Sequence, residues 1–146
     1  MTWLPRKRIL VPIDFSEAGV KAIQNAMEMV ESPSDIHVLY VLTPTDFTSP
    51  GVVLGNVNDE TRIASATEHM DQFLKRHEIE GVTRLVQSGD PGLVISDYAA
   101  EASVDLIVMP SHGHHGIRRV LLGSVAERVL RHAECPVLVL RRSDID

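Results

Sequence analysis

The sequence predicts an α/β fold, an open five-stranded parallel sheet with helices on both faces, formed by a single domain over residues 1–146. Five short apolar runs rich in branched residues alternate with segments of helical periodicity. Strands and helices that alternate in this way form right-handed crossovers and a parallel sheet. A length of 146 residues, 44% of them hydrophobic, suits one globular domain with a buried core.

The first half of the chain is predicted to form strand, helix, strand, loop and helix. Residues 8–15 (RILVPIDF) and 35–42 (DIHVLYVL) are nearly continuous apolar runs, which are typical of strands covered on both faces. Between them, Ser16 is placed to cap a helix with apolar residues at helical spacing. A polar loop follows over residues 43–58, and the next helix is expected to close at the Gly81 turn.

The second half continues the same alternation. Residues 82–87 (VTRLVQ) form a third predicted strand, and residues 104–110 (VDLIVMP) form a fourth. Between them, Asp90 is expected to cap a helix with Pro91 in its first turn, where a missing N–H costs nothing. A further helix precedes the fifth strand, residues 135–140 (CPVLVL).

Composition excludes several classes of function. A net charge of −6 argues against a nucleic-acid surface. The first apolar run is interrupted by Pro12 and is too short for a membrane span, so we expect a cytoplasmic protein with no membrane contact. The single cysteine, Cys135, rules out an intramolecular disulfide and lies in an apolar context, which predicts a buried structural thiol.

Ligands of open parallel sheets bind beyond the carboxyl ends of the strands, near the point where the strand order reverses. Asp14 follows the first predicted strand, and Ser111 follows the fourth. We therefore expect functional residues at these two strand ends. The loop over residues 43–58 leaves the same edge and is placed to cover such a site.

Three histidines gather in the segment MPSHGHHGIRRVLLGS, residues 109–124. His112, His114 and His115 have no helical spacing and no supporting cysteine pair, so we predict no metal site. The adjacency of Ser111 and His112 is not a catalytic triad, and the G-x-S-x-G nucleophile elbow is absent. We predict no catalytic residue.

The same segment contains a strand end, glycines and a helix start in an order that is compatible with phosphate binding. A strand ends at Pro110, Gly113 permits backbone conformations closed to other residues, and Gly123 with Ser124 opens a helix. The free N–H groups at that helix start and the Ser124 hydroxyl can bind phosphate oxygens. The spacing also allows the simpler interpretation that the glycines only turn the chain and that Ser124 only caps a helix.

Two segments carry a resemblance to a known family. ILVPIDFSE near the start and SHGHHGIRRVLLGSVAERVLRHAECPVLVLRR near the end closely resemble the universal stress protein family, and the resemblance covers essentially the whole chain. The ATP-binding branch of that family has glycine, two residues, glycine, nine residues, then glycine followed by serine or threonine. Gly113 and the pair Gly123 and Ser124 match this pattern, whereas Pro110 replaces the first glycine. Proline removes a backbone donor and adds a ring beside the ligand.

The resemblance implies a strand order of 3-2-1-4-5, bound ATP accompanied by Mg²⁺, and a homodimer formed through the last strand, Pro136 to Leu140. It implies that Asp14 accepts hydrogen bonds from ribose hydroxyls or positions a metal-phosphate group, and that Met109 lies beside the base. The implied nucleotide-binding residues are Pro12, Asp14, Val41, Met109, Pro110, Ser111, His112, Gly113, Gly123, Ser124 and Val125.

Three functions fit these observations. The first is a dimeric stress-response regulator or binding module that holds ATP. The second is a dimeric stress protein without nucleotide, for which Pro110 is the main argument. The third is a slow ATPase or nucleotidyl-transfer enzyme, whose usual H-x-G-H turn or serine-glycine-rich loop is missing after the first strand.

Overall fold

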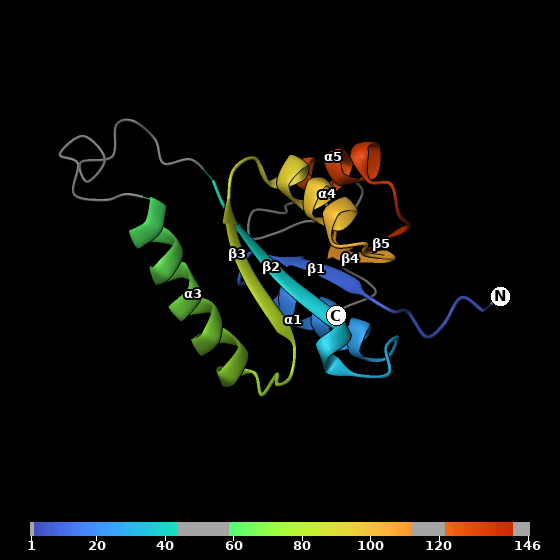
Figure 1. Ribbon diagram of the computed structural model, residues 1–146, viewed down its shortest axis with the longest axis horizontal. Helices are drawn as coiled ribbons and strands as arrows, with labels where there is room; N and C mark the ends of the chain where they lie inside the picture. The colour runs from blue at the N-terminus through green and yellow to red at the C-terminus, as the bar shows by residue number, and fades with distance from the viewer. Residues whose placement is uncertain (1, 44–58, 112–121, 142–146) are drawn as a thin grey trace.

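The computed structural model describes residues 2–43, 59–111 and 122–141, and it confirms the predicted α/β class (Figure 1). Strands and helices alternate along the described chain, with a short 3-10 helix, η1, before the second strand. In chain order the elements are β1 (Ile9–Ile13), α1 (Glu17–Met27), η1 (Pro33–Asp35), β2 (Ile36–Leu42), α3 (Asp59–Arg76), β3 (Thr83–Ser88), α4 (Pro91–Glu101), β4 (Leu106–Pro110), α5 (Ser124–His132) and β5 (Val137–Leu140).

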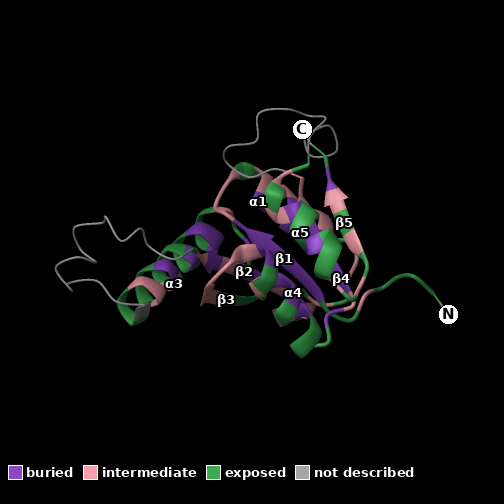
Figure 2. Ribbon diagram, turned by 90° about the horizontal axis from the view of Figure 1, so that it is seen from above, coloured by how far each residue is buried: buried purple, intermediate pink, exposed green. Residues whose placement is uncertain are grey.

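The strands form one parallel sheet in the order β3-β2-β1-β4-β5, which confirms the expected topology. Helices α1 and α3 cover one face, and α4 and α5 cover the other (Figure 1). β1 lies at the centre and is buried along its whole length (Figure 2). Ile9 and Val11 pack into the core beneath α1, whereas Leu10 packs into the core beneath α4 and α5. β1 thus contributes side chains to the core on each face of the sheet, which explains its continuous apolar run.

The start of α1 differs from the expectation. Ser16 occupies the N-cap position with an extended backbone, but its side chain makes no capping hydrogen bond. Its hydroxyl oxygen is buried and has no hydrogen-bond partner among the described residues. The Asp14 carboxylate instead accepts a hydrogen bond from the Ser16 N–H at 3.1 Å, so the preceding strand end orders the helix entry.

The end of α3 also differs from the expectation, since the helix stops at Arg76 and not at the Gly81 turn. Glu78 adopts a left-handed backbone conformation with a φ of 56°. The Ile79 N–H then bonds back to the Leu74 carbonyl at 2.9 Å, and the buried Ile79 side chain seals the turn. Gly81, with a φ of 85°, serves the later turn into β3.

Helix α4 begins as predicted. Pro91 is its first residue, and the Asp90 carboxylate accepts a hydrogen bond from the Leu93 N–H at 3.1 Å. The same carboxylate pairs with Arg128 of α5 at 2.8 Å, so Asp90 joins the two helices on this face.

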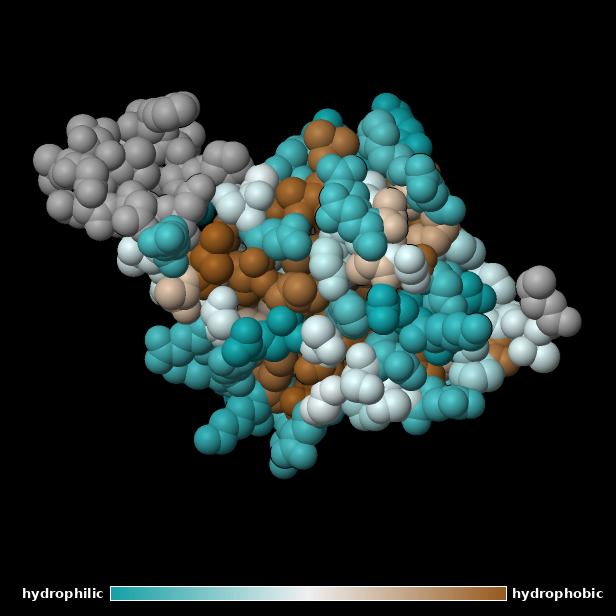
Figure 3. All heavy atoms as spheres, viewed as in Figure 1, coloured by the Kyte–Doolittle hydropathy of each residue, from teal (hydrophilic) through white to brown (hydrophobic). Residues whose placement is uncertain are grey.

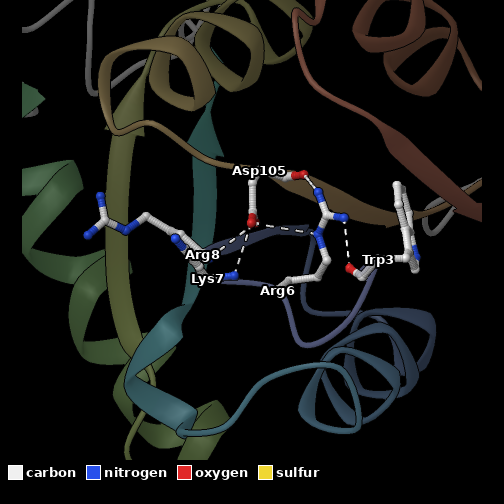
Figure 4. A network of polar contacts seen from close by, with 5 residues as sticks. All are labelled: Trp3, Arg6, Lys7, Arg8 and Asp105. Atoms are coloured by element: carbon white, nitrogen blue, oxygen red, sulfur yellow. Dashed lines mark hydrogen bonds and ion pairs between the residues drawn. The ribbon is translucent and has the colours of Figure 1, made fainter. Parts of the chain in front are cut away.

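The amino end of β1 is fastened to β4 by Asp105 (Figure 4). Its carboxylate accepts hydrogen bonds from the backbone N–H groups of Lys7 at 3.0 Å and Arg8 at 3.1 Å. The Arg6 side chain, only 11% exposed, places Nε 3.7 Å from this carboxylate and donates from Nη2 to the Asp105 carbonyl. The guanidinium also lies over the Trp3 ring, 4.1 Å from its centroid.

Replacement of Asp105 by alanine should lower the free energy of unfolding by about 2–3 kcal/mol, because it leaves the backbone N–H groups of Lys7 and Arg8 without their acceptor and removes the carboxylate beside the mostly buried Arg6 guanidinium. Chemical denaturation of the native protein and of Asp105→Ala measures this difference.

Asp71→Ala is the matched control for that experiment. Asp71 also pairs with an arginine, Arg84, at 2.6 Å, but both side chains are about half exposed and the pair holds no backbone group. We expect the control to change stability by less than about 1 kcal/mol. An equal loss in both variants would contradict the role given to Asp105.

Candidate functional site

β1 and β4 pair only at their amino ends. Leu10 lies opposite Ile107, and beyond this point the two strands no longer pair with each other. β4 instead continues beside β5 as far as Pro110, which lies opposite Leu140. The central pair of strands therefore separates toward its carboxyl ends, where ligands of open parallel sheets bind.

Two prolines account for the separation. Ile107 and Ser111 donate their backbone N–H groups toward β5, at 3.0 and 2.9 Å. Because successive strand residues direct their backbone groups to opposite sides, the nitrogen of Pro110 faces β1. Neither Pro110 nor Pro12 on the facing strand has an N–H to donate, so the ladder cannot continue through them.

A pocket of about 630 Å³ lies at this separation. Figure 3 shows apolar side chains gathered between α3 and α4, beside the carboxyl ends of β2 and β3. The structure brings together nine of the predicted binding residues in the pocket lining; His112 and Gly113 lie outside the described residues. The predicted residues in the lining are Pro12, Asp14, Val41, Met109, Pro110, Ser111, Gly123, Ser124 and Val125.

The lining also contains residues that the sequence did not single out. Pro91 and Ile95 are four residues apart on α4 and present one helix face to the pocket. Leu39 lies on the same face of β2 as Val41. The two-residue period of a strand could therefore have predicted Leu39 once Val41 was named. The remaining residues missed from the lining are Ile13, Tyr40, Thr43 and Ala126.

The amino end of α5 supplies the polar wall of the pocket. The Gly123 N–H donates to the Ser111 carbonyl at 2.8 Å, which fixes the helix start against the end of β4. The first intrahelical bond runs from Glu127 to the Gly123 carbonyl at 2.9 Å, so the N–H groups of Ser124, Val125 and Ala126 precede it. Gly123, as N-cap, has no side chain to accept from them.

Gly123 has a φ of −66°, a value that other residues adopt readily. Backbone freedom is therefore not the reason for glycine at this position. A side chain here would stand beside the first-turn N–H groups of α5, at the pocket wall. The arrangement offers backbone donors and the positive end of a helix dipole to an anion.

Other candidate groups lie away from the pocket or show no activation. Burial raises the pKa of the half-buried Cys135 thiol, which keeps it protonated at neutral pH. His37 lies near the amino end of β2, with Nδ1 2.5 Å from the Tyr98 hydroxyl, and burial lowers its pKa. Within residues 2–43, 59–111 and 122–141, no three histidine, cysteine or carboxylate side chains are grouped to hold a metal. His114 and His115 lie outside these ranges.

No helix in the described part of the chain is both long and apolar enough to cross a bilayer. The longest one that the structure describes, α3, has 18 residues and carries several charged side chains.

Known proteins match the chain over nearly its full length. The sequence profile of the universal stress protein family matches residues 5–141. Universal stress protein MJ0531 of Methanocaldococcus jannaschii is 33% identical over 141 residues, which cover 93% of this chain and 82% of that protein. Universal stress protein YxiE of Bacillus subtilis is 30% identical, with 92% of this chain and 98% of that protein covered.

Solved structures agree with these matches. Protein MJ0577 of Methanocaldococcus jannaschii superposes with a TM-score of 0.76 at 28% identity, covering 95% of this chain and 98% of that chain. A universal stress protein family protein from Arabidopsis thaliana, solved with AMP bound, superposes with a TM-score of 0.55, covering 92% of this chain and 90% of that chain. Its 19% identity shows a common fold alone. On the profile match and the 33% identity to MJ0531, this chain belongs to the universal stress protein family.

Proposed function

We propose that the protein is a cytoplasmic, dimeric stress-response regulator that binds ATP, accompanied by Mg²⁺, in the pocket between β1 and β4. The observation that carries the proposal is the first turn of α5, whose backbone donors line a pocket opened by the separation of two central strands. The volume of about 630 Å³ falls within the range of small-molecule sites, about 300–1,000 Å³.

The pocket lining has apolar residues for the base of a nucleotide and polar groups for its phosphates and ribose. Val41 and Met109 give the apolar surface that a purine needs, as do the neighbouring side chains of α4. Ser124 and Val125 offer a hydroxyl and backbone N–H groups to the phosphates. Asp14, at the end of β1, lines the pocket, and in this proposal its carboxylate accepts hydrogen bonds from ribose hydroxyls.

Mg²⁺ fits the donor set as a companion of the phosphates. This ion is usually held by one or two carboxylates together with phosphate oxygens and water. Asp14 is the carboxylate among the described lining residues. The ion, when bound, would neutralise phosphate charge, and Asp14 would orient it from the end of β1.

The described lining supports binding and not rapid turnover. It contains no lysine, arginine or histidine. Phosphoryl transfer needs cationic groups on the transferred phosphate and a group that orients the nucleophile. We therefore propose a binding module whose occupancy changes its contacts, with at most slow hydrolysis.

A fold relative gives a precedent for the ligand class. The Arabidopsis thaliana protein was solved with AMP, and a further universal stress protein was solved in complex with cAMP. Both are 19% identical to this chain, so the proposal rests on the chemistry of this pocket.

The proposed dimer uses the last strand, Pro136 to Leu140. β5 is an edge of the sheet, with β4 on one side, and its Leu138 side chain is 39% exposed. Leu130 of α5 is 47% exposed as well. An apolar edge strand of this kind is suited to pair with a second copy across a two-fold axis.

Gly123→Val should weaken ATP binding at least about tenfold, because a branched side chain would obstruct the phosphates at the first turn of α5. Isothermal titration calorimetry with ATP and Mg²⁺ measures the loss against the native protein. Leu122→Val is the matched control, because the substitution lies one residue earlier at a side chain outside the pocket lining, and it should bind as the native protein does.

Pro110→Gly tests the alternative of a nucleotide-free stress protein. This variant places the family glycine at position 110. Pro12 still has no N–H to donate to β4, so we expect the strands to stay apart and the variant to bind ATP at least as tightly as the native protein. Binding by Pro110→Gly with none by the native protein would reject the proposal and favour the nucleotide-free function.

Leu138→Lys should convert the dimer to a monomer, because it places a charge in the proposed apolar interface. Sedimentation velocity measures the mass of both proteins. Leu93→Lys, at a leucine of α4 that is 40% exposed, is the matched control and should remain dimeric. A native monomer, or a Leu138→Lys dimer of unchanged stability, would contradict the interface.

A further inference from the structure

Phe15 directly follows the pocket residue Asp14 and has an unusual backbone. Its φ is 68°, in the left-handed region that residues with a side chain seldom adopt. Such a conformation persists only where surrounding contacts hold it, and it is found preferentially at functional sites.

The Phe15 ring is held by aromatic rings from two other elements. It stacks on His69 of α3, with centroids 4.5 Å apart and planes 12° apart. It also contacts Tyr40 of β2 at 4.4 Å and Phe73 of α3 at 5.3 Å. Contacts of these distances stabilise an aromatic side chain in one orientation, so the ring anchors a backbone that would otherwise relax.

The left-handed residue reverses the chain between strand and helix. This reversal brings the Ser16 N–H back to the Asp14 carboxylate, 3.1 Å from Oδ1. This hydrogen bond holds the Asp14 carboxylate at the end of β1, in the pocket lining. Tyr40 contacts the Phe15 ring and also lines the pocket, so the cluster and the pocket share a wall.

We propose that Phe15 is a positioning residue for the nucleotide site: clamped by His69 and Tyr40, it holds the Asp14 carboxylate where ribose hydroxyls are recognised. This inference rests on the proposed nucleotide function and adds the residues that set its sugar specificity. It also connects α3 to the site, because His69 of α3 contacts Phe15, although no α3 residue is in the described lining.

The test compares ATP with 2′,3′-dideoxy-ATP, which lacks the ribose hydroxyls. Without Mg²⁺, Phe15→Ala should weaken ATP binding about tenfold and leave dideoxy-ATP binding nearly unchanged, because in the absence of the ion Asp14 engages only the ribose hydroxyls. His69→Ala should produce a smaller loss of the same kind. Calorimetric dissociation constants for both nucleotides measure the difference.

His77→Ala is the matched control for His69→Ala. His77 follows the same helix and contacts Phe73 at 4.8 Å, but it has no ring contact with Phe15. Its replacement should leave both dissociation constants unchanged. Phe15→Gly should bind ATP more tightly than Phe15→Ala, because glycine adopts a positive φ without strain. If Phe15→Ala fails to fold, the two nucleotides are compared with Phe15→Gly in its place.

A second readout requires no nucleotide. The Ser16 amide bonds to Asp14, so its hydrogen exchange should accelerate about tenfold in Phe15→Ala. Native protein that binds no ATP rejects the proposed function, while the exchange rate still tests whether Phe15 positions Asp14. Equal weakening of both nucleotides by Phe15→Ala, or an unchanged Ser16 exchange rate, would overturn the positioning role.

Discussion

The missing hydrogen bonds between β1 and β4 determine how this molecule is organised. These strands lie side by side at the centre of the sheet, yet they pair only at their amino ends. Pro12 and Pro110 have no N–H groups to continue the hydrogen bonding between the strands. At the amino-terminal end, the Asp105 carboxylate accepts hydrogen bonds from the residues that precede β1. The two strands are therefore held together at one end and separate at the other, and the pocket lies at the separated end.

Backbone donors explain how an acidic protein can bind a polyanion. The chain has a net charge of −6, and the described pocket lining contains no cationic side chain. The first turn of α5 nevertheless presents N–H groups with no side-chain cap. In the proposed function, local geometry and not net charge provides the interaction with phosphate. Proline at the position of the family glycine removes one donor but keeps the strands apart.

The sequence predicted features that depend on local pattern. Apolar runs predicted the strands, Asp90 predicted the start of α4, and the family resemblance predicted nine residues of the pocket lining. Features set by contacts distant in sequence were missed. The end of α3 depends on Glu78 and Ile79 closing onto the core, and Phe15 keeps its conformation through rings on β2 and α3. Neither the end of α3 nor the Phe15 conformation is indicated by the residues of its own segment.

The most direct test of the account is a map of backbone amide chemical shifts during titration with ATP and Mg²⁺. The largest changes are expected at Ser124, Val125 and Ala126, the donors at the α5 start, with further changes next to Asp14. Amides at the closed end of the strands, such as Arg8, should not move. Changes centred away from the separation of β1 and β4, or no changes at all, would contradict the central claim.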